Sequence, residues 1–338
     1  MSERILLGHG GGGSLMQQLI REELLPLYGC SSGSPEAPVL HDAARLALPH
    51  GRLAFTCDGY VVQPLEFPGG DIGSLAVIGT ANDLAMAAAR PLHLSVSLIL
   101  EEGLPLALLR RVVASMAAAA ARCGLTIVTG DTKVVERGKA DGLFISTSGV
   151  GLLELPNPVD PTAIQPGDVL LVSGDLGRHG VAILAARHAL DLQPPVQSDC
   201  APLWPQVEAL LAAGVRPHCL RDLTRGGLAS ALAELAEGSG CDLLLEEAAV
   251  PVSGSVARTC DLLGFDPLQL ANEGRFVAVV PAAQKDQALA VLEASGGALV
   301  GWVSSAVPAG MPRVLLRTAF GTERLLLPGS GELLPRIC

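Results

Sequence analysis

The sequence is poor in aromatic residues and in positive charge, and it has no long apolar run. Aromatic residues make up 3% of the chain, so its cores must be built from aliphatic side chains. Lys and Arg total 23 against 34 Asp and Glu, which gives a net charge of −11. A nucleic-acid surface needs clustered positive charge, so this balance argues against a nucleic-acid partner. The longest apolar stretches, such as residues 112–121, fall short of the ~20 residues that span a bilayer, so no membrane segment is expected.

The eight cysteines form no CxxC pair and no His–Cys spacing typical of zinc sites. Residues 5–8 are too few for the apolar core of a secretion signal, so none is expected. We therefore expect reduced cysteines and a cytoplasmic protein.

The apolar content of 49% and charged content of 17% are those of a folded chain, and 338 residues favour two domains. Three prolines within residues 155–161 mark the best boundary, since proline interrupts helices and sheets. We expect domains at 1–155 and 156–328, and a flexible tail at 329–338. Helices are predicted at 105–122, 204–213 and 227–237. Strands are predicted at 53–56, 92–100, 125–128, 143–148, 169–172, 243–245 and 276–280.

Three apolar runs in the first half, at residues 53–58, 76–83 and 126–131, each end in Asp. Asp is a poor strand residue but a good ligand at the end of an element. Asp58, Asp83 and Asp131 would repel one another if gathered, unless a hard cation such as Mg²⁺ joined them. Helix or turn capping accounts for any one of them alone.

The segment Gly8-His9-Gly10-Gly11-Gly12-Gly13 precedes the amphipathic stretch 15–25. The backbone N–H groups of Gly10, Gly11 and Gly12 are able to approach phosphate oxygens at a helix start. No Walker lysine follows, and a flexible N-terminal lead explains the same residues equally well.

The second half offers two polar segments beside predicted elements. Residues 221–227 place Asp222 and Thr224 before a helix, where they suit phosphate or metal–phosphate contacts, although capping explains part of the pattern. Residues 271–275 place Glu273 in a turn before a strand, where a solvated turn is the simpler interpretation.

Cys338 is the last residue of the sequence. A prenylation signal would place the cysteine four residues from the end, so that modification is excluded. An exposed thiol is easily oxidised, so the interpretation of Cys338 as a stray free cysteine without a function is disfavoured. From Gly329 the ten-residue tail can span at most ~33–36 Å, enough to reach a site on this chain or on a neighbour.

With these residues in view, the chain resembles the HypE family of hydrogenase maturation factors, within the ATP-binding superfamily of aminoimidazole ribonucleotide synthetase. The resemblance covers nearly the whole length. It is carried by the motifs Asp58-Gly-Tyr, Phe67-Pro-Gly-Gly-Asp, Gly130-Asp-Thr-Lys, Arg221-Asp-Leu-Thr-Arg-Gly-Gly, Ala271-Asn-Glu-Gly and the final Pro335-Arg-Ile-Cys.

The resemblance implies a two-domain α+β fold of the PurM-like type. The N-terminal sheet would pair with its twin across a homodimer barrel, and an α/β domain would follow. ATP would lie between the domains with Mg²⁺ on its phosphates. The acids Asp58, Asp83, Asp131 and Asp222 would surround the metal, with Asn82 and Thr224 beside them.

The resemblance also implies a reaction. The carbamoyltransferase HypF would carbamoylate Cys338, ATP would drive dehydration to a thiocyanate, and the HypC–HypD complex would accept the cyanide for iron. Two proton removals need a base, for which Glu273 is the first candidate. Lys133 is a candidate for positioning the oxygen or relaying a proton, and His9 is a weaker candidate.

Two positions depart from the family pattern, namely Cys57, where relatives commonly carry Thr, and Arg178, where they often carry Asp. Two other functions stay open. A related ATP-dependent kinase or synthetase would act on a diffusible substrate and would not need residues 335–338. A non-catalytic carrier would hold a group on Cys338 without consuming ATP.

Overall fold

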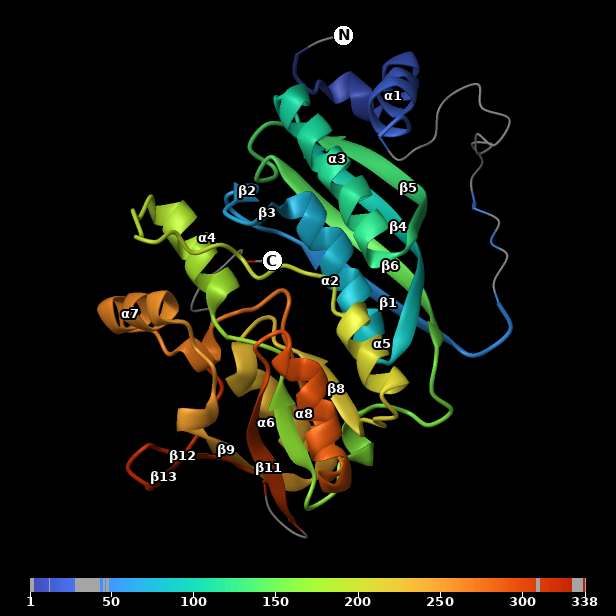
Figure 1. Ribbon diagram of the computed structural model, residues 1–338. Coiled ribbons are helices and arrows are strands. Elements are labelled where there is room, and N and C mark those ends of the chain that lie inside the picture. The colour runs from blue at the N-terminus through green and yellow to red at the C-terminus, as the bar shows by residue number, and fades with distance from the viewer. Residues whose placement is uncertain are drawn as a thin grey trace.

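A computed structural model describes residues 3–11, 13–27, 43, 44, 46, 49–307, 311–329 and 337. Two sheets dominate it, one in each half of the chain (Figure 1). The expected α+β fold is confirmed, because each sheet carries α-helices against it and the order of elements mixes helix and strand throughout.

The N-terminal sheet has four strands in the order β1 (Leu53–Tyr60), β6 (Leu143–Leu153), β4 (Ala89–Glu101) and β5 (Thr126–Val135). Only β4 and β5 run parallel, and α3 (Leu106–Cys123) makes the crossover that parallel strands require. α2 (Ile72–Met86) lies beside α3 on the same face of the sheet (Figure 1). No described helix covers the opposite face, which we call the open face.

The C-terminal sheet has seven strands in the order β13-β12-β9-β11-β7-β10-β8. Both β7 (Val169–Val172) and β10 (Phe276–Val280) are buried throughout, because helices cover both faces of the sheet. The other strands are β8 (Cys219–Asp222), β9 (Cys241–Glu246), β11 (Ala298–Ala306), β12 (Val314–Arg317) and β13 (Glu323–Leu325).

α6 (Gly227–Ser239) packs on one face of the C-terminal sheet, and α5 (Trp204–Ala212) with α8 (Lys285–Glu293) on the other. α4 (Arg178–His188) and α7 (Gly254–Leu263) share a smaller core of their own. Short elements complete the chain, namely Leu7–Gly10, α1 (Ser14–Gln18), Leu19–Leu24, β2 (Glu66–Phe67), β3 (Gly70–Asp71), Pro161–Ala163, Glu247–Ala249, Pro267–Gln269 and Ala282–Gln284.

The two halves are packed together through α4 and the segment 196–203. Ile183 of α4 and Ala271 belong to the same buried cluster as the helices of the N-terminal sheet. The backbone N–H of Ser198 donates to the carbonyl of Pro68, 2.8 Å away. Gly69 has φ +94° and lies so close to Ser198 that a Cβ would overlap its backbone.

The sequence predictions match β7 and β10 residue for residue and α3 to within a residue. One premise was wrong, since the acidic residues do not end their elements. β1 continues to Tyr60, α2 to Met86 and β5 to Val135. None of the described helices is long and apolar enough to cross a membrane.

Candidate active site

Four acidic side chains meet where the two halves of the chain face each other. Asp58 comes from β1, Asp83 from α2, Asp222 from the end of β8, and Glu273 from the turn before β10. Asp58 lies on the helix-facing side of β1, as do its even-numbered neighbours. Thr56, one of these, donates from Oγ1 to Asp83 Oδ2 at 2.9 Å, which ties the strand to the helix.

The charges of this cluster act on one another. Burial, and next the charge of Asp222, raises the pKa of Asp83 to about 7, against the opposing hydrogen bond from Thr56. Burial also raises the pKa of Asp222, where nearby Arg221 opposes the shift and Asp58 adds to it. Carboxylates that raise each other's pKa share a crowded negative field, which a bound cation would relieve.

Glu273 is the most buried member, with 3% of its surface exposed, so the solvated-turn interpretation of this residue is wrong. Burial raises its pKa well above the ordinary range, and the charges of Asp222 and Asp199 add to the shift. No hydrogen-bond partner for its buried Oε1 is found among the described residues. A buried polar atom of this kind is costly unless a ligand completes it.

Asp199 holds the turn that carries Glu273. Its carboxylate accepts from the N–H groups of Glu273 and Gly274, both at 3.3 Å, and its side chain is inaccessible. No apolar run or glycine marks this residue in the sequence, so sequence reasoning missed it. Asn272, also missed, accepts from Gly177 N–H at 2.7 Å and donates to the carbonyls of Leu223 and Leu270.

Asn82 lies beside the acids and links the two halves. Its Nδ2 donates to the carbonyls of Ala201 and Glu273, at 3.1 and 3.2 Å. Its Oδ1 accepts from Leu203 N–H at 2.8 Å. Both amide protons and the oxygen are therefore engaged with backbone, and a direct contact to a nucleotide stays a prediction.

Thr224 lies in the tight turn between β8 and α6, where its carbonyl accepts from Gly227 N–H at 2.9 Å. Gly227 has φ +60°, and a Cβ there would lie 2.5 Å from the carbonyl oxygen of Leu270. Only glycine fits this position, which brings the start of α6 close to the Glu273 turn.

A second group of predicted site residues lies apart from the four acids. Asp131 and Lys133 form an ion pair on β5, with Nζ 2.9 Å from Oδ2. The hydrogen bond from Lys133 is the main cause that lowers the pKa of Asp131. The register of the sheet aligns Asp131 on β5 with Gly59 on β1, in one row across the four strands. The two residues are three strand spacings apart, which is ~14 Å.

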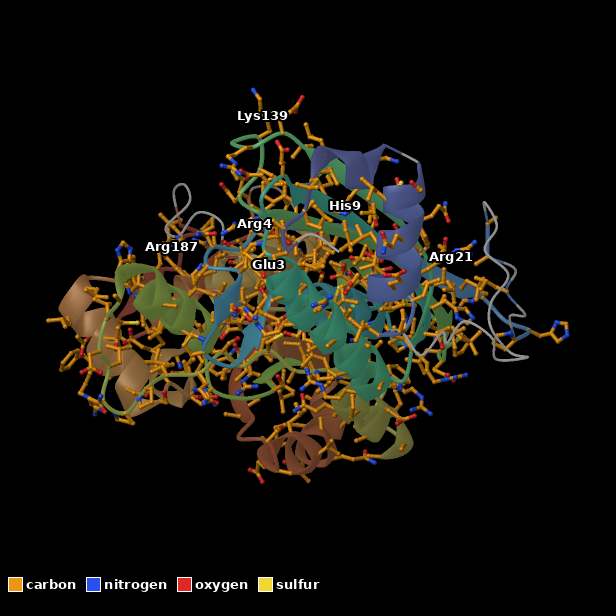
Figure 2. All side chains as sticks on the ribbon, turned by 90° about the horizontal axis from the view of Figure 1, so that it is seen from above. Glu3, Arg4, His9, Arg21, Lys139 and Arg187 are labelled. Carbon is orange, nitrogen blue, oxygen red and sulfur yellow. The ribbon has the colours of Figure 1, made fainter. Side chains whose placement is uncertain are left out.

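Residues in one row share a face, so Asp131 and Lys133 point to the open face, whereas Asp58 points to the helices. Within one chain, therefore, the structure does not bring Asp131 to the other three predicted metal ligands, Asp58, Asp83 and Asp222. His9 and Gly10 lie next to this strand, since a Cβ on Gly10 would meet the backbone of Val134 at 2.8 Å. Figure 2 labels His9, which is buried and accepts from Leu6 N–H through Nδ1. Gly11 follows at the exposed end of this short helix.

Two predicted site residues, Gly12 and Cys338, lie outside the described residues. Ile337, the neighbour of Cys338, is described and is buried, with 6% exposure. Within the described part of the chain, no three His, Cys, Asp or Glu side chains stand close enough to hold a metal ion alone. A Mg²⁺ ion at the four acids would thus need further ligands, such as the phosphate oxygens of a nucleotide.

Comparison with known proteins places this arrangement in a family. Residues 40–153 match the N-terminal domain, and residues 165–307 the C-terminal domain, of the AIR synthase related proteins. The carbamoyl dehydratase HypE of Rhodobacter capsulatus is 50% identical, over 99% of this chain and 98% of its own. The carbamoyl dehydratase HypE of Escherichia coli is 44% identical, over 99% of each chain.

Solved structures agree. The hydrogenase maturation protein HypE in complex with ATP is similar with a TM-score of 0.92 and 45% identity, covering 98% of this chain and 99% of that one. HypE in a HypE–HypF complex is similar with a TM-score of 0.78 and 41% identity, covering 84% and 92%. The chain therefore belongs to the carbamoyl dehydratase HypE family of hydrogenase maturation proteins, built from two AIR synthase related domains.

Proposed function

We propose that this chain uses ATP to dehydrate a carbamoyl group on the sulfur of Cys338, giving a thiocyanate that supplies cyanide to the iron of a [NiFe] hydrogenase. The observation that carries the proposal is the cluster of three half-buried acids, Asp58, Asp83 and Asp222, around the buried Glu273. Relatives at 44–50% identity over the whole chain are carbamoyl dehydratases, and a similar structure holds ATP.

The residues fit a magnesium–nucleotide complex. Asp58, Asp83 and Asp222 present hard oxygen ligands. Burial, and then the charges of neighbouring acids, raises the pKa of Asp83 and of Asp222, which favours a divalent cation. Bound there, Mg²⁺ would neutralise phosphate charge during phosphoryl transfer. The turn at Thr224 would offer backbone N–H groups to the nucleotide. Gly10 lies beside β5 with Asp131, so the glycine segment at residues 10–12 would reach the nucleotide across the dimer interface proposed below.

The reaction needs the amide oxygen to become a leaving group. The thiocarbamate oxygen attacks the γ-phosphorus of ATP, the bond to the β-phosphate oxygen breaks, and ADP leaves. Loss of the two nitrogen protons and cleavage of the carbon–oxygen bond then release phosphate and leave S–C≡N. Glu273 is suited to take a proton, because a carboxylate with a raised pKa is a stronger base once ionised.

We propose 1–155 and 156–328 as the two domains, since the segment between β6 and β7 joins the two sheets. We further propose that two copies pair through the open face. Phe55 of β1 is 71% exposed there, and Leu53 is 44% exposed. Asp131 and Lys133 lie on the same face, so we place their contribution to the site at this interface.

The carbamoyl donor would be HypF, which the solved HypE–HypF complex supports. The HypC–HypD complex would accept the cyanide. The diffusible-substrate alternative has only fold-level support, because solved thiamine monophosphate kinases match at 19–20% identity.

The deciding experiment is the intact mass of the protein after incubation with its carbamoyl-transfer partner, before and after ATP is added. We expect a carbamoyl adduct on the C-terminal peptide that loses the mass of one water when ATP is present. Cys338→Ala should keep ATP binding and lose both mass changes. Undiminished cyanide formation by Cys338→Ala, or by a chain lacking residues 335–338, would overturn the proposal.

A further inference from the structure

His179 is a fully buried histidine that the proposed chemistry does not use. It is the second residue of α4, and both of its ring nitrogens are engaged. Nδ1 lies 2.8 Å from Ser198 Oγ, and Nε2 lies 3.0 Å from the carbonyl oxygen of Ile337, the residue before Cys338. The ring also stands edge-to-face with Phe67, 5.5 Å between centroids.

The direction of these hydrogen bonds follows from the partners. A carbonyl oxygen only accepts, so Nε2 of His179 must carry the proton that it donates to Ile337. The neutral ring then accepts at Nδ1 from the hydroxyl of Ser198. Burial lowers the pKa of His179, which keeps the ring in this neutral form. Ser198 Oγ accepts in turn from Cys200 N–H at 3.1 Å, so each group in the chain of bonds has a defined role.

Ile337 is held in other ways as well. It forms an antiparallel bridge with Val62, and its side chain is part of the core of the N-terminal half. Arg187, at the other end of α4, donates two hydrogen bonds to the carbonyl of Gln63, at 2.9 and 3.1 Å. Gln63 is the residue after Val62. Arg187 is labelled in Figure 2. α4 thus bonds to Ile337 and to Gln63, the residue that follows its bridge partner Val62.

Two short segments of the chain connect this docking place to the acid cluster. Val62 is four residues beyond Asp58, a distance of ~13 Å along an extended chain. Ser198 is followed directly by Asp199, whose carboxylate holds the Glu273 turn. The segment that contains Val62 is therefore continuous with Asp58, and the segment that contains Ser198 is continuous with Asp199.

We propose that His179 is a positioning residue that fixes the register of the chain end, by donating a hydrogen bond to the Ile337 carbonyl while Ser198 orients its ring. The inference rests on the proposed function, in which the sulfur of Cys338 carries the reacting group. Because Cys338 is bonded to Ile337, holding one carbonyl limits where that group travels. Entropy that is lost in advance does not have to be lost in the reaction.

The test compares His179→Leu, which removes both hydrogen bonds at similar volume, with His179→Gln, which keeps an N–H donor. His188→Leu is the matched control, since His188 is exposed at the far end of the same helix. Three quantities are measured in the full-length protein: ATP affinity, the single-turnover rate of ATP-dependent dehydration of the carbamoylated chain, and hydrogen exchange of the C-terminal peptide.

For His179→Leu we expect unchanged ATP affinity, a dehydration rate lower by about 10- to 100-fold, and faster exchange at the C-terminal peptide. His179→Gln should recover part of both losses, and His188→Leu should match the wild type. A rate and an exchange profile that match the wild type in both His179 variants would overturn the inference. The inference would also be overturned if both His179 variants lost ATP affinity and thermal stability to the same extent, because that result indicates a role in packing alone. If the wild-type protein itself forms no nitrile, the proposed function fails, and the exchange data still test the anchor.

Discussion

At the scale of single residues, the site combines carboxyl groups that differ in how tightly they hold a proton. Burial raises the pKa of Glu273 well above its ordinary range, and the charges of Asp222 and Asp199 add to the shift. Asp83, with a pKa of about 7, is balanced between its two forms. Asp131 is ionised, since Lys133 lowers its pKa. Divergent proton affinities of this kind are typical of sites that move protons.

Glu273→Gln tests the proposed base. Glutamine keeps the size and the hydrogen-bonding ends of the side chain but cannot accept a proton. We expect the single-turnover dehydration rate to fall by about 100-fold or more, with ATP affinity preserved. Glu208→Gln is the control, because Glu208 is exposed on α5. A wild-type rate in Glu273→Gln would assign the proton removal to another group.

The pKa of Asp83 predicts a pH dependence with a defined sign. The folded-state pKa of about 7 exceeds the unfolded value of 3.8, so the folded protein holds the proton more tightly between these values. This contribution to stability is present at low pH and is lost as the pH rises toward 7. Metal–nucleotide binding that needs ionised Asp83 should therefore release a proton below pH 7.

Calorimetry of magnesium–ATP binding in buffers of different ionisation enthalpy measures that proton. Asp83→Asn should reduce the release and flatten part of the loss of stability in the same window, because Asp222 also has a raised pKa. Asp131→Asn should leave the release intact, because Asp131 is already ionised. Undiminished proton release in Asp83→Asn would assign the titration to another group.

The sequence revealed the acids but not how they are grouped. Asp58, Asp83 and Asp131 look alike as endings of apolar runs, yet a one-residue difference in strand parity sends Asp58 to the helices and Asp131 to the open face. Asp199 is invisible from sequence because its function depends on a contact with a turn that lies 74 positions away.

At the scale of elements, strands buried on both faces were easy to predict and the central helix was not. β7 and β10 are short unbroken apolar runs, the usual pattern of interior strands. α2 is buried along nearly its whole length, so its sequence has no polar stripe to mark a helix. Asp83 is the one residue of α2 that is not buried, and it faces the acid cluster.

The turn before α6 offers a test of how closely two elements must approach. Gly227→Ala would force alanine into a left-handed conformation, at roughly 1–2 kcal/mol. It would also place a methyl group on the Leu270 carbonyl, for about a further 1–3 kcal/mol. Chemical denaturation measures the sum.

Gly240→Ala is the matched control, because Gly240 has a similar φ of +69° and nothing lies within 4 Å of its would-be Cβ. Only the conformational part should appear in that variant. Equal destabilisation of Gly227→Ala and Gly240→Ala would show that a Cβ at position 227 does not clash with the carbonyl of Leu270. In Gly227→Ala we also expect weaker ATP binding, since Asp222 and Thr224 flank the displaced turn.

At the scale of the whole molecule, the open face of the N-terminal sheet exposes apolar side chains that no described element of the same chain covers. The helix-facing side of the N-terminal sheet is closed by α2 and α3, whereas on β1 the burial alternates strictly and leaves Leu53, Phe55 and Cys57 exposed. A phenylalanine that is 71% exposed in the middle of a strand is costly in water. The proposed homodimer would cover it.

Phe55→Glu should therefore convert the dimer to a monomer, because two buried carboxylates would face an apolar surface without partners. Sedimentation or light scattering gives the mass directly. Leu262→Glu is the control, since Leu262 is 81% exposed on α7, in the other half of the chain, and should leave the mass unchanged. A dimer that persists in Phe55→Glu would place the interface elsewhere. A monomer that keeps full dehydration activity would show that Asp131 and Lys133 do not act across it.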